Sequence, residues 1–210
     1  MRRKMLKNEC NVFRKTVPRL FEMICSMDRM MTKIIGRESY SFDQVTVIEK
    51  MTYDVIAVSC VYRDNFFFNK VKLGSLNASL SGLSDVVGDL EKVSREADGL
   101  AVTIRDSIKL YQQNEDHIEK PDNFEYKLLQ LDMQLGEKFF EIRRAYLMIR
   151  SLLMDLRFIV MRDYTRILMG VDLIQEYKRS QKEVQRIVIK ALPLEEFAKL
   201  NHKGGDSDDE

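Results

Sequence analysis

Residue types that commonly carry out catalysis or bind metals are sparse in this chain. Its 210 residues include two histidines, His117 and His202, and three cysteines, Cys10, Cys25 and Cys60, with no Cys-x-x-Cys pair. A zinc site or a Ser-His-Asp triad needs such side chains gathered on ordered elements, and both histidines fall in segments predicted as loop or tail. Phosphate-binding sequences of the forms GxxxxGKS/T and GxGxxG are absent. We therefore expect no enzymatic activity, no cofactor and no small-molecule substrate.

Arginines at regular spacing are the clearest binding feature in the sequence. Three of them recur every seven residues, so on a helix each is displaced by only about 20° from the last. An exposed row of cations would attract anionic lipid headgroups or an acidic partner, at about 1 kcal/mol for each cation near a membrane. The alternative is a solvated helix face with ordinary ion pairs. The candidate residues are Arg143, Arg150 and Arg157, with Arg144, Arg162 and Arg166 beside them.

A second basic group lies at the N-terminus, where Arg2, Arg3, Lys4 and Lys7 are the candidate binding residues. Residues 1–37 carry ten Lys/Arg and three Asp/Glu, a net charge of +7, against +1 for the whole chain. A basic amphipathic helix can lie in a membrane interface; the alternative is that its apolar stripe packs on the rest of the protein. Nucleic acid is not an expected partner because the remaining residues sum to −6 and show no aromatic-basic motif.

Few breakers interrupt the chain, so long helices should position these groups. With three prolines, nine glycines and no tryptophan, the composition favours an all-α fold. The first predicted helix occupies residues 1–37, with a kink near Pro18 or a helix beginning there. Its apolar residues recur at alternating spacings of four and three, the heptad pattern of a helix that packs on a partner. They are Leu6, Cys10, Phe13, Val17, Leu20, Ile24, Met27, Met31 and Ile34.

Two further helical segments follow. The second is predicted to begin at a capping box at residues 41–44 and to end near residue 112, with Gly74 as a bend or a turn. Its apolar seam includes Ile48, Met51, Val55, Val58 and Tyr62. The third is predicted to begin after Asp122 and to run unbroken past Ile174, for 65 to 70 residues and roughly 100 Å.

These segments predict an elongated antiparallel three-helix bundle or coiled coil that forms a dimer. The last two predicted helices would form a hairpin joined at residues 112–123, with the first packed alongside. Residues 1–37 form the basic helix, residues 38–200 the long bundle, and residues 201–210 a disordered acidic tail. No run approaches the roughly 18 apolar residues of a membrane span. We expect a cytoplasmic protein whose cysteines are reduced core thiols.

Two stretches of the sequence resemble the BAR-domain family. VIEKMTYDVIAVSCVYRDNFFFNKVKLGSLNASLSGL and FIVMRDYTRILMGVDLIQEY are similar to sequences of divergent ciliary BAR-domain proteins. The order of one shorter helix, a long helix, a tip loop and a final long helix resembles that family as well. The resemblance implies a crescent-shaped homodimer that senses or bends membranes, in that subgroup at the base of cilia or at centrioles.

Two functions are compatible with these features. The first is a non-enzymatic, membrane-associated scaffold, a BAR-like dimer that binds anionic or curved membranes through its basic helix faces. The alternative is a coiled-coil adaptor subunit of a tethering, kinetochore or cytoskeletal complex, in which other helical proteins fill the heptad seams. Binding to anionic vesicles that weakens with added salt would favour the first function.

Overall fold

The computed structural model describes residues 2–35, 41–64, 70–113, 123–179 and 182–183. Four long helices account for most of them: α1 (Arg2–Ile35), α2 (Phe42–Asp64), α3 (Lys70–Gln113) and α4 (Phe124–Leu168). A shorter helical segment covers residues 173–179. No strand occurs within these described ranges, so the predicted all-α class is confirmed.

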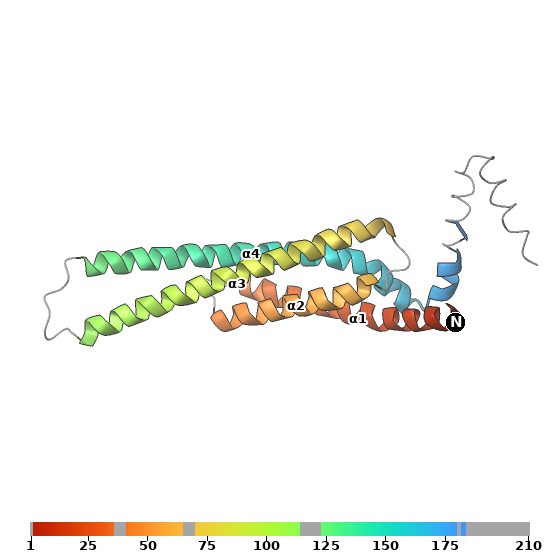
Figure 1. Cartoon of the computed structure of the whole chain (residues 1–210), viewed down its shortest axis with the longest axis horizontal. Coiled ribbons are helices and arrows are strands. Elements are labelled where there is room, and N and C mark those ends of the chain that lie inside the picture. The colour runs from red at the N-terminus through yellow and green to blue at the C-terminus, as the bar shows by residue number, and fades with distance from the viewer. Residues whose placement is uncertain (1, 36–40, 65–69, 114–122, 180–181, 184–210) are drawn as a thin grey trace, which may run out of the picture.

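The four helices run alternately up and down along one axis (Figure 1). Each packs on two neighbours, α1 on α2 and α4, and α3 on α2 and α4. The hairpin of α3 and α4 extends well past the ends of α1 and α2 (Figure 1). The molecule is therefore a four-helix body with a two-helix arm.

Helix α1 buries the predicted heptad stripe. From Cys10 to Ile34 every member of that stripe is at most 5% exposed, and the helix continues through Pro18. A helix that begins at Pro18 is therefore the wrong alternative. The stripe packs within one core to which all four helices contribute, so this apolar face is not available for insertion into a membrane.

The segment predicted as one helix from residue 42 to 112 is two antiparallel helices. Helix α2 begins at Phe42, as expected, and ends at Asp64, whereas α3 begins at Lys70. Gly74 is neither a bend nor a turn, because it lies inside α3. The buried face of α2 also differs in part from the prediction: Thr52 and Ser59 are fully buried, whereas the predicted Met51 and Val58 are half-buried.

Helices α3 and α4 keep one antiparallel register over their whole length. Near the arm's end, the rings of Tyr111 and Phe124 stack with centroids 4.6 Å apart. In the middle, Lys138 Nζ lies 2.9 Å from Glu96 Oε2, and in the body Gly82 faces the Leu152 side chain. The two residue numbers sum to 234 or 235 in each pair, so no bulge interrupts the packing.

The prediction of a third helix of 65 to 70 residues is wrong, because α4 has 45 residues and ends at Leu168. Gly170 has φ +67°, its N–H donates to the Ile167 carbonyl, and the Val171 N–H donates to the Arg166 carbonyl. This pair of bonds around a left-handed glycine is the Schellman ending of a helix.

The chain then starts a new helical turn. The Asp172 carboxylate accepts hydrogen bonds from the Ile174 and Gln175 N–H groups, which is how an N-cap residue begins a helix. Leu173 is buried at 1% exposure. The segment after the break therefore packs on the core and does not continue along the axis of α4.

The arm comprises residues 98–113 of α3 and 124–141 of α4. None of its residues is buried, since the last buried residue of α3 is Ala97 and the first of α4 is Ile142. At about 1.5 Å per residue the arm is roughly 25 Å long. A pair of helices of this length has too little buried apolar surface to be stable without the body or a partner.

Candidate interaction surfaces

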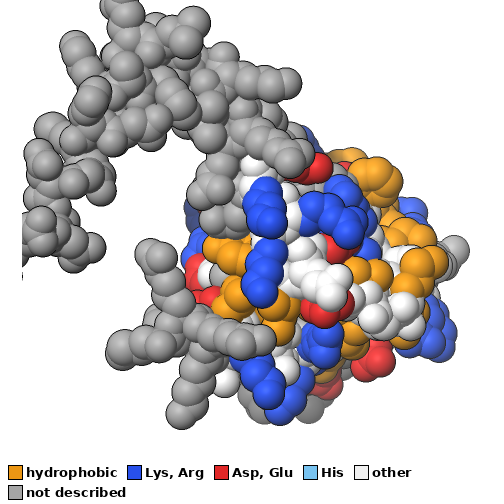
Figure 2. Space-filling model, turned by 90° about the vertical axis from the view of Figure 1, so that its right-hand side faces the viewer, with side chains coloured by type: hydrophobic (Ala, Val, Ile, Leu, Met, Phe, Trp, Pro, Cys, Tyr) orange, Lys and Arg blue, Asp and Glu red, His pale blue; other side chains and the backbone are white. Residues whose placement is uncertain are grey.

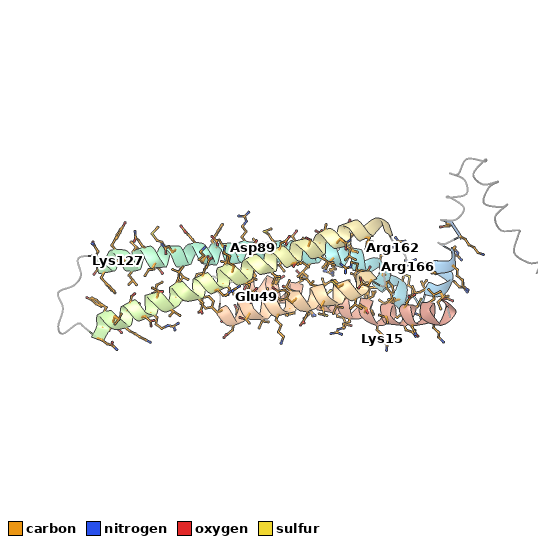
Figure 3. The ribbon with its side chains drawn as sticks, in the orientation of Figure 1. Lys15, Glu49, Asp89, Lys127, Arg162 and Arg166 are labelled. Atoms are coloured by element: carbon orange, nitrogen blue, oxygen red, sulfur yellow. The ribbon has the colours of Figure 1, made fainter. Side chains whose placement is uncertain are left out.

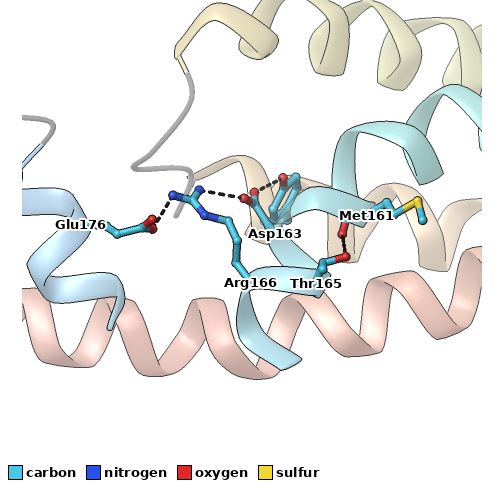
Figure 4. Close-up of polar contacts among 6 residues, drawn as sticks. Met161, Asp163, Thr165, Arg166 and Glu176 are labelled. Atoms are coloured by element: carbon cyan, nitrogen blue, oxygen red, sulfur yellow. Dashed lines mark hydrogen bonds and ion pairs between the residues drawn. The ribbon is translucent and has the colours of Figure 1, made fainter. Parts of the chain in front are cut away.

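A buried polar network lies at the end of the body opposite the arm. The Tyr62 hydroxyl donates to Asp163 Oδ2 at 2.8 Å, and Asp163 is only 4% exposed. Arg166 lies between Asp163 Oδ1, at 3.4 Å, and the carboxylate of Glu176 (Figure 4). Burial, followed by the charge of Asp163, raises the pKa of Tyr62. The network connects α2, α4 and the segment after the break, so Arg166 has a structural role here.

The arginine row predicted as a binding face is partly used inside the protein. Arg150 Nε lies 2.9 Å from Asp28 Oδ1 on α1, and the Arg157 guanidinium lies 5.8 Å from the centroid of the Phe21 ring. Phe21 also stacks on Tyr164. Both arginines are half-buried, so this row forms a seam between α4 and α1.

Other predicted residues remain at the surface. Arg143, Arg144 and Arg162 are exposed and form no ion pair with any residue in the described ranges. Lys7 is exposed as well. The side chains of Arg2, Arg3 and Lys4 lie outside those that the structure describes.

The end of the molecule opposite the arm carries a basic surface. Between residues 6 and 20 the exposed cations of α1 are Lys7, Arg14, Lys15 and Arg19, and Figure 3 labels Lys15 and, on α4, Arg162 toward this end of the molecule. Seen end-on, Lys and Arg side chains spread over this end between smaller areas of Asp and Glu (Figure 2). This surface could attract an anionic partner.

The largest feature that the sequence analysis missed is a second apolar seam on α4. Of the 17 large hydrophobic side chains exposed among the described residues, ten lie on α4 or at Met169 directly after it. Seven apolar residues follow one another at intervals of seven, so on a straight helix each is displaced by only about 20° from the last and neighbouring members share a side. We call this set the outer seam: Tyr126, Met133, Phe140, Leu147, Met154, Met161 and Leu168.

The outer seam is separate from the face of α4 that packs in the core. Six of its seven side chains are between 49% and 71% exposed, and Met154 is half-buried. The core face consists of residues such as Tyr146 and Ile149, both fully buried. At about 100° per residue, Leu147 points roughly 100° away from Tyr146 and roughly 160° away from Ile149. A helix that is apolar on two faces needs a second partner or an apolar environment.

An ion-pair cluster marks the root of the arm. Lys138 Nζ contacts Glu96 on α3 at 2.9 Å and Glu141 on its own helix at 3.2 Å. The hydrogen bond from Lys138 lowers the pKa of Glu96, and hydrogen bonds from both acids raise the pKa of Lys138. A shallow groove between α3 and α4 runs past this cluster toward Met148. Its lining mixes both signs of charge and identifies no particular ligand.

The described residues provide no grouping of three or more His, Cys, Asp or Glu side chains that could hold a metal ion. Both histidines named in the sequence analysis lie outside the described ranges. The three cysteines are free thiols, with Cys10 buried and Cys25 and Cys60 half-buried. Within the same ranges, no helix has the length and apolar character required to cross a bilayer.

Comparison with known proteins gives no match: no family model, no curated protein and no solved structure resembles the chain closely enough to be matched.

Proposed function

We propose that this protein is a non-enzymatic adaptor that binds helices of other proteins along the outer seam of α4. The observation that carries the proposal is the line of exposed apolar side chains from Tyr126 to Leu168. These 43 residues span about 63 Å of helix. Apolar residues at heptad spacing are the pattern by which helices dock on one another, and an uncovered apolar surface of this extent typically marks an interaction site.

The arm supports the same proposal. Its residues are at best half-buried, and large side chains such as Tyr126 and Met133 are each 61% exposed. In the body, by contrast, α1 and α2 cover the hairpin of α3 and α4. A helix of another protein lying along the seam would cover these exposed side chains of the arm. The arm would then be a docking platform that becomes fully buried only in the complex.

Seam substitutions provide the test. A tagged chain carrying Phe140→Glu and Met161→Glu should lose its stoichiometric protein partners in quantitative purification from the cells that express it. Charges placed in a buried apolar interface cost several kcal/mol. The matched control is Val47→Glu with Tyr53→Glu, which makes the same chemical change at exposed apolar sites on α2. Equal loss in both variants, or no loss in either, would contradict the proposal.

Membrane association is the second candidate function, and the basic surface favours it. Lys7, Arg14, Lys15 and Arg19 are all exposed at the end opposite the arm, and a BAR-like dimer that binds anionic membranes is what the family resemblance implies. The test is co-sedimentation with phosphatidylserine vesicles at low salt. Binding that falls with salt and with Lys15→Glu plus Arg19→Glu would support it. Absence of binding at low salt would reject it.

A further inference from the structure

We propose that the half of the outer seam on the body selects an acidic amphipathic helix. This inference rests on the proposed adaptor function and adds the chemistry of the partner. The relevant segment runs from Phe140 to Leu168, 29 residues that span about 42 Å of helix. Phe140, Leu147, Met161 and Leu168 are all exposed along it.

The charges that flank this half of the seam are mostly positive. Exposed Arg143 and Arg144 follow Phe140, and exposed Arg162 follows Met161. The acids at the surface of the same stretch are Glu141, which pairs with Lys138, and Asp155, whereas Asp163 is buried in its network. Three cations without an ion pair among the described residues therefore border an apolar line. Exposed like charges that remain unpaired are suited to select the opposite charge on a partner.

The arginine row lies along one side of this half of the seam. Arg143, Arg150 and Arg157 each follow a seam residue by three positions, the offset between positions a and d of a heptad. Contacts with Asp28 and Phe21 hold two of them against α1. A docked helix would thus have apolar residues over the seam and acidic residues toward the exposed Arg143.

The arm half of the seam differs in charge. Around Tyr126 and Met133 the exposed charges are Glu125, Lys127, Asp132 and Glu137, so acids outnumber cations there. The preference for acidic residues should therefore be confined to the body half. A second copy is a poorer occupant here, because two-fold pairing of this stretch would bring its arginines toward those of the other copy.

The experiment measures binding of the full chain to three labelled synthetic helices by fluorescence anisotropy. Each probe has about four heptads with leucine along one face, and the flanking positions are all Glu, all Gln or all Lys. The Glu helix should bind at least about tenfold more tightly than the Gln helix, and the Lys helix should bind most weakly. The affinity for the Glu helix should fall as salt is raised.

Charge reversal sharpens the test. The affinity for the Glu helix should fall by about 30-fold, and that for the Lys helix should rise, in a chain that carries Arg143→Glu, Arg144→Glu and Arg162→Glu together. All three side chains are exposed, so the fold should persist. The matched control reverses three exposed cations elsewhere, Lys50, Arg105 and Lys109, and should change none of the three affinities by more than about twofold.

Each of the other possible results would overturn the inference, and each would point to a different explanation. Equal binding of the Glu and Gln helices would leave the adaptor function standing and reject charge selection. Failure of all three helices to bind would reject both. Sedimentation of the chain as a dimer that Phe140→Glu dissociates would identify a second copy as the occupant. Binding to phosphatidylserine vesicles that is lost on the arginine reversal would assign this face to a membrane.

Discussion

Replacing Asp163 with alanine should be among the most destabilising single substitutions in this protein. Asp163 is 4% exposed, accepts the Tyr62 hydroxyl at 2.8 Å and lies 3.4 Å from Arg166. A hydrogen bond to a charged group contributes about 1.5–3 kcal/mol, and depriving a buried group of its acceptor costs about 1–3 kcal/mol more. Arg166 keeps its contact with Glu176, so the sum should stay near 3–5 kcal/mol, as for other broken buried pairs.

Urea unfolding followed by circular dichroism measures this effect as a lower midpoint at constant slope. The control is Asp155→Ala, which removes an exposed carboxylate from the same helix and should change the free energy of unfolding by less than about 0.5 kcal/mol. Combining Asp163→Ala with Tyr62→Phe should cost less than the sum of the two single changes, with a coupling of about 1–3 kcal/mol. If Asp163→Ala were no worse than its control, the network would not hold this end of the body together.

Three other predictions concern stability. Arg150→Glu with Arg157→Glu should lower the free energy of unfolding by about 2 kcal/mol, measured by urea melts, because both side chains contact α1. Gly170→Ala should lower the melting temperature and reduce the free energy of unfolding by about 1–2 kcal/mol, since φ is +67°. Gly74 lies inside α3 with open space around it, so Gly74→Ala should instead raise the free energy of unfolding by about 0.5–1 kcal/mol. Above pH 10 the unfolded chain ionises its tyrosines while Tyr62, whose pKa burial raises, stays protonated. Stability should therefore fall as pH rises, by up to about 1.4 kcal/mol per pH unit from this group, and less steeply in Tyr62→Phe.

The buried stripe of α1 could be predicted because its heptad members from Cys10 to Ile34 are all apolar. The buried face of α2 could not be, because two of its members are polar. Thr52 is fully buried, and its hydroxyl donates to the Ile48 carbonyl at 2.8 Å, so the helix itself satisfies the side chain. Hydrophobicity alone therefore favoured the neighbouring Met51, which is half-buried.

The end of α4 at Leu168 could not be predicted from Gly170 alone. A single glycine inside a helical pattern has a modest cost, and Gly136 does lie within α4. Gly170 differs because Asp172 follows two residues later and caps a new turn. A glycine followed closely by a capping residue predicts a break better than either does alone.

The outer seam was present in the sequence but could not be distinguished from core. Tyr126, Met133 and Phe140 are as apolar as the residues that α4 buries, and heptad spacing applies to both faces. Which face the rest of the chain covers depends on where α1 and α3 pack. The arginine row was identified as exposed for the same reason, although α1 holds Arg150 and Arg157.

Site-specific photo-crosslinking in the cells that express the protein tests the adaptor function most directly. A photoreactive phenylalanine analogue would replace Phe140 or Met161 on the outer seam and, as controls, Lys50 or Asp54 on the exposed face of α2. The adaptor function predicts that both seam positions crosslink to a helical segment of a particular protein, whereas the α2 positions do not. Equal crosslinking from seam and control positions, or crosslinking of the seam to lipid alone, would contradict it.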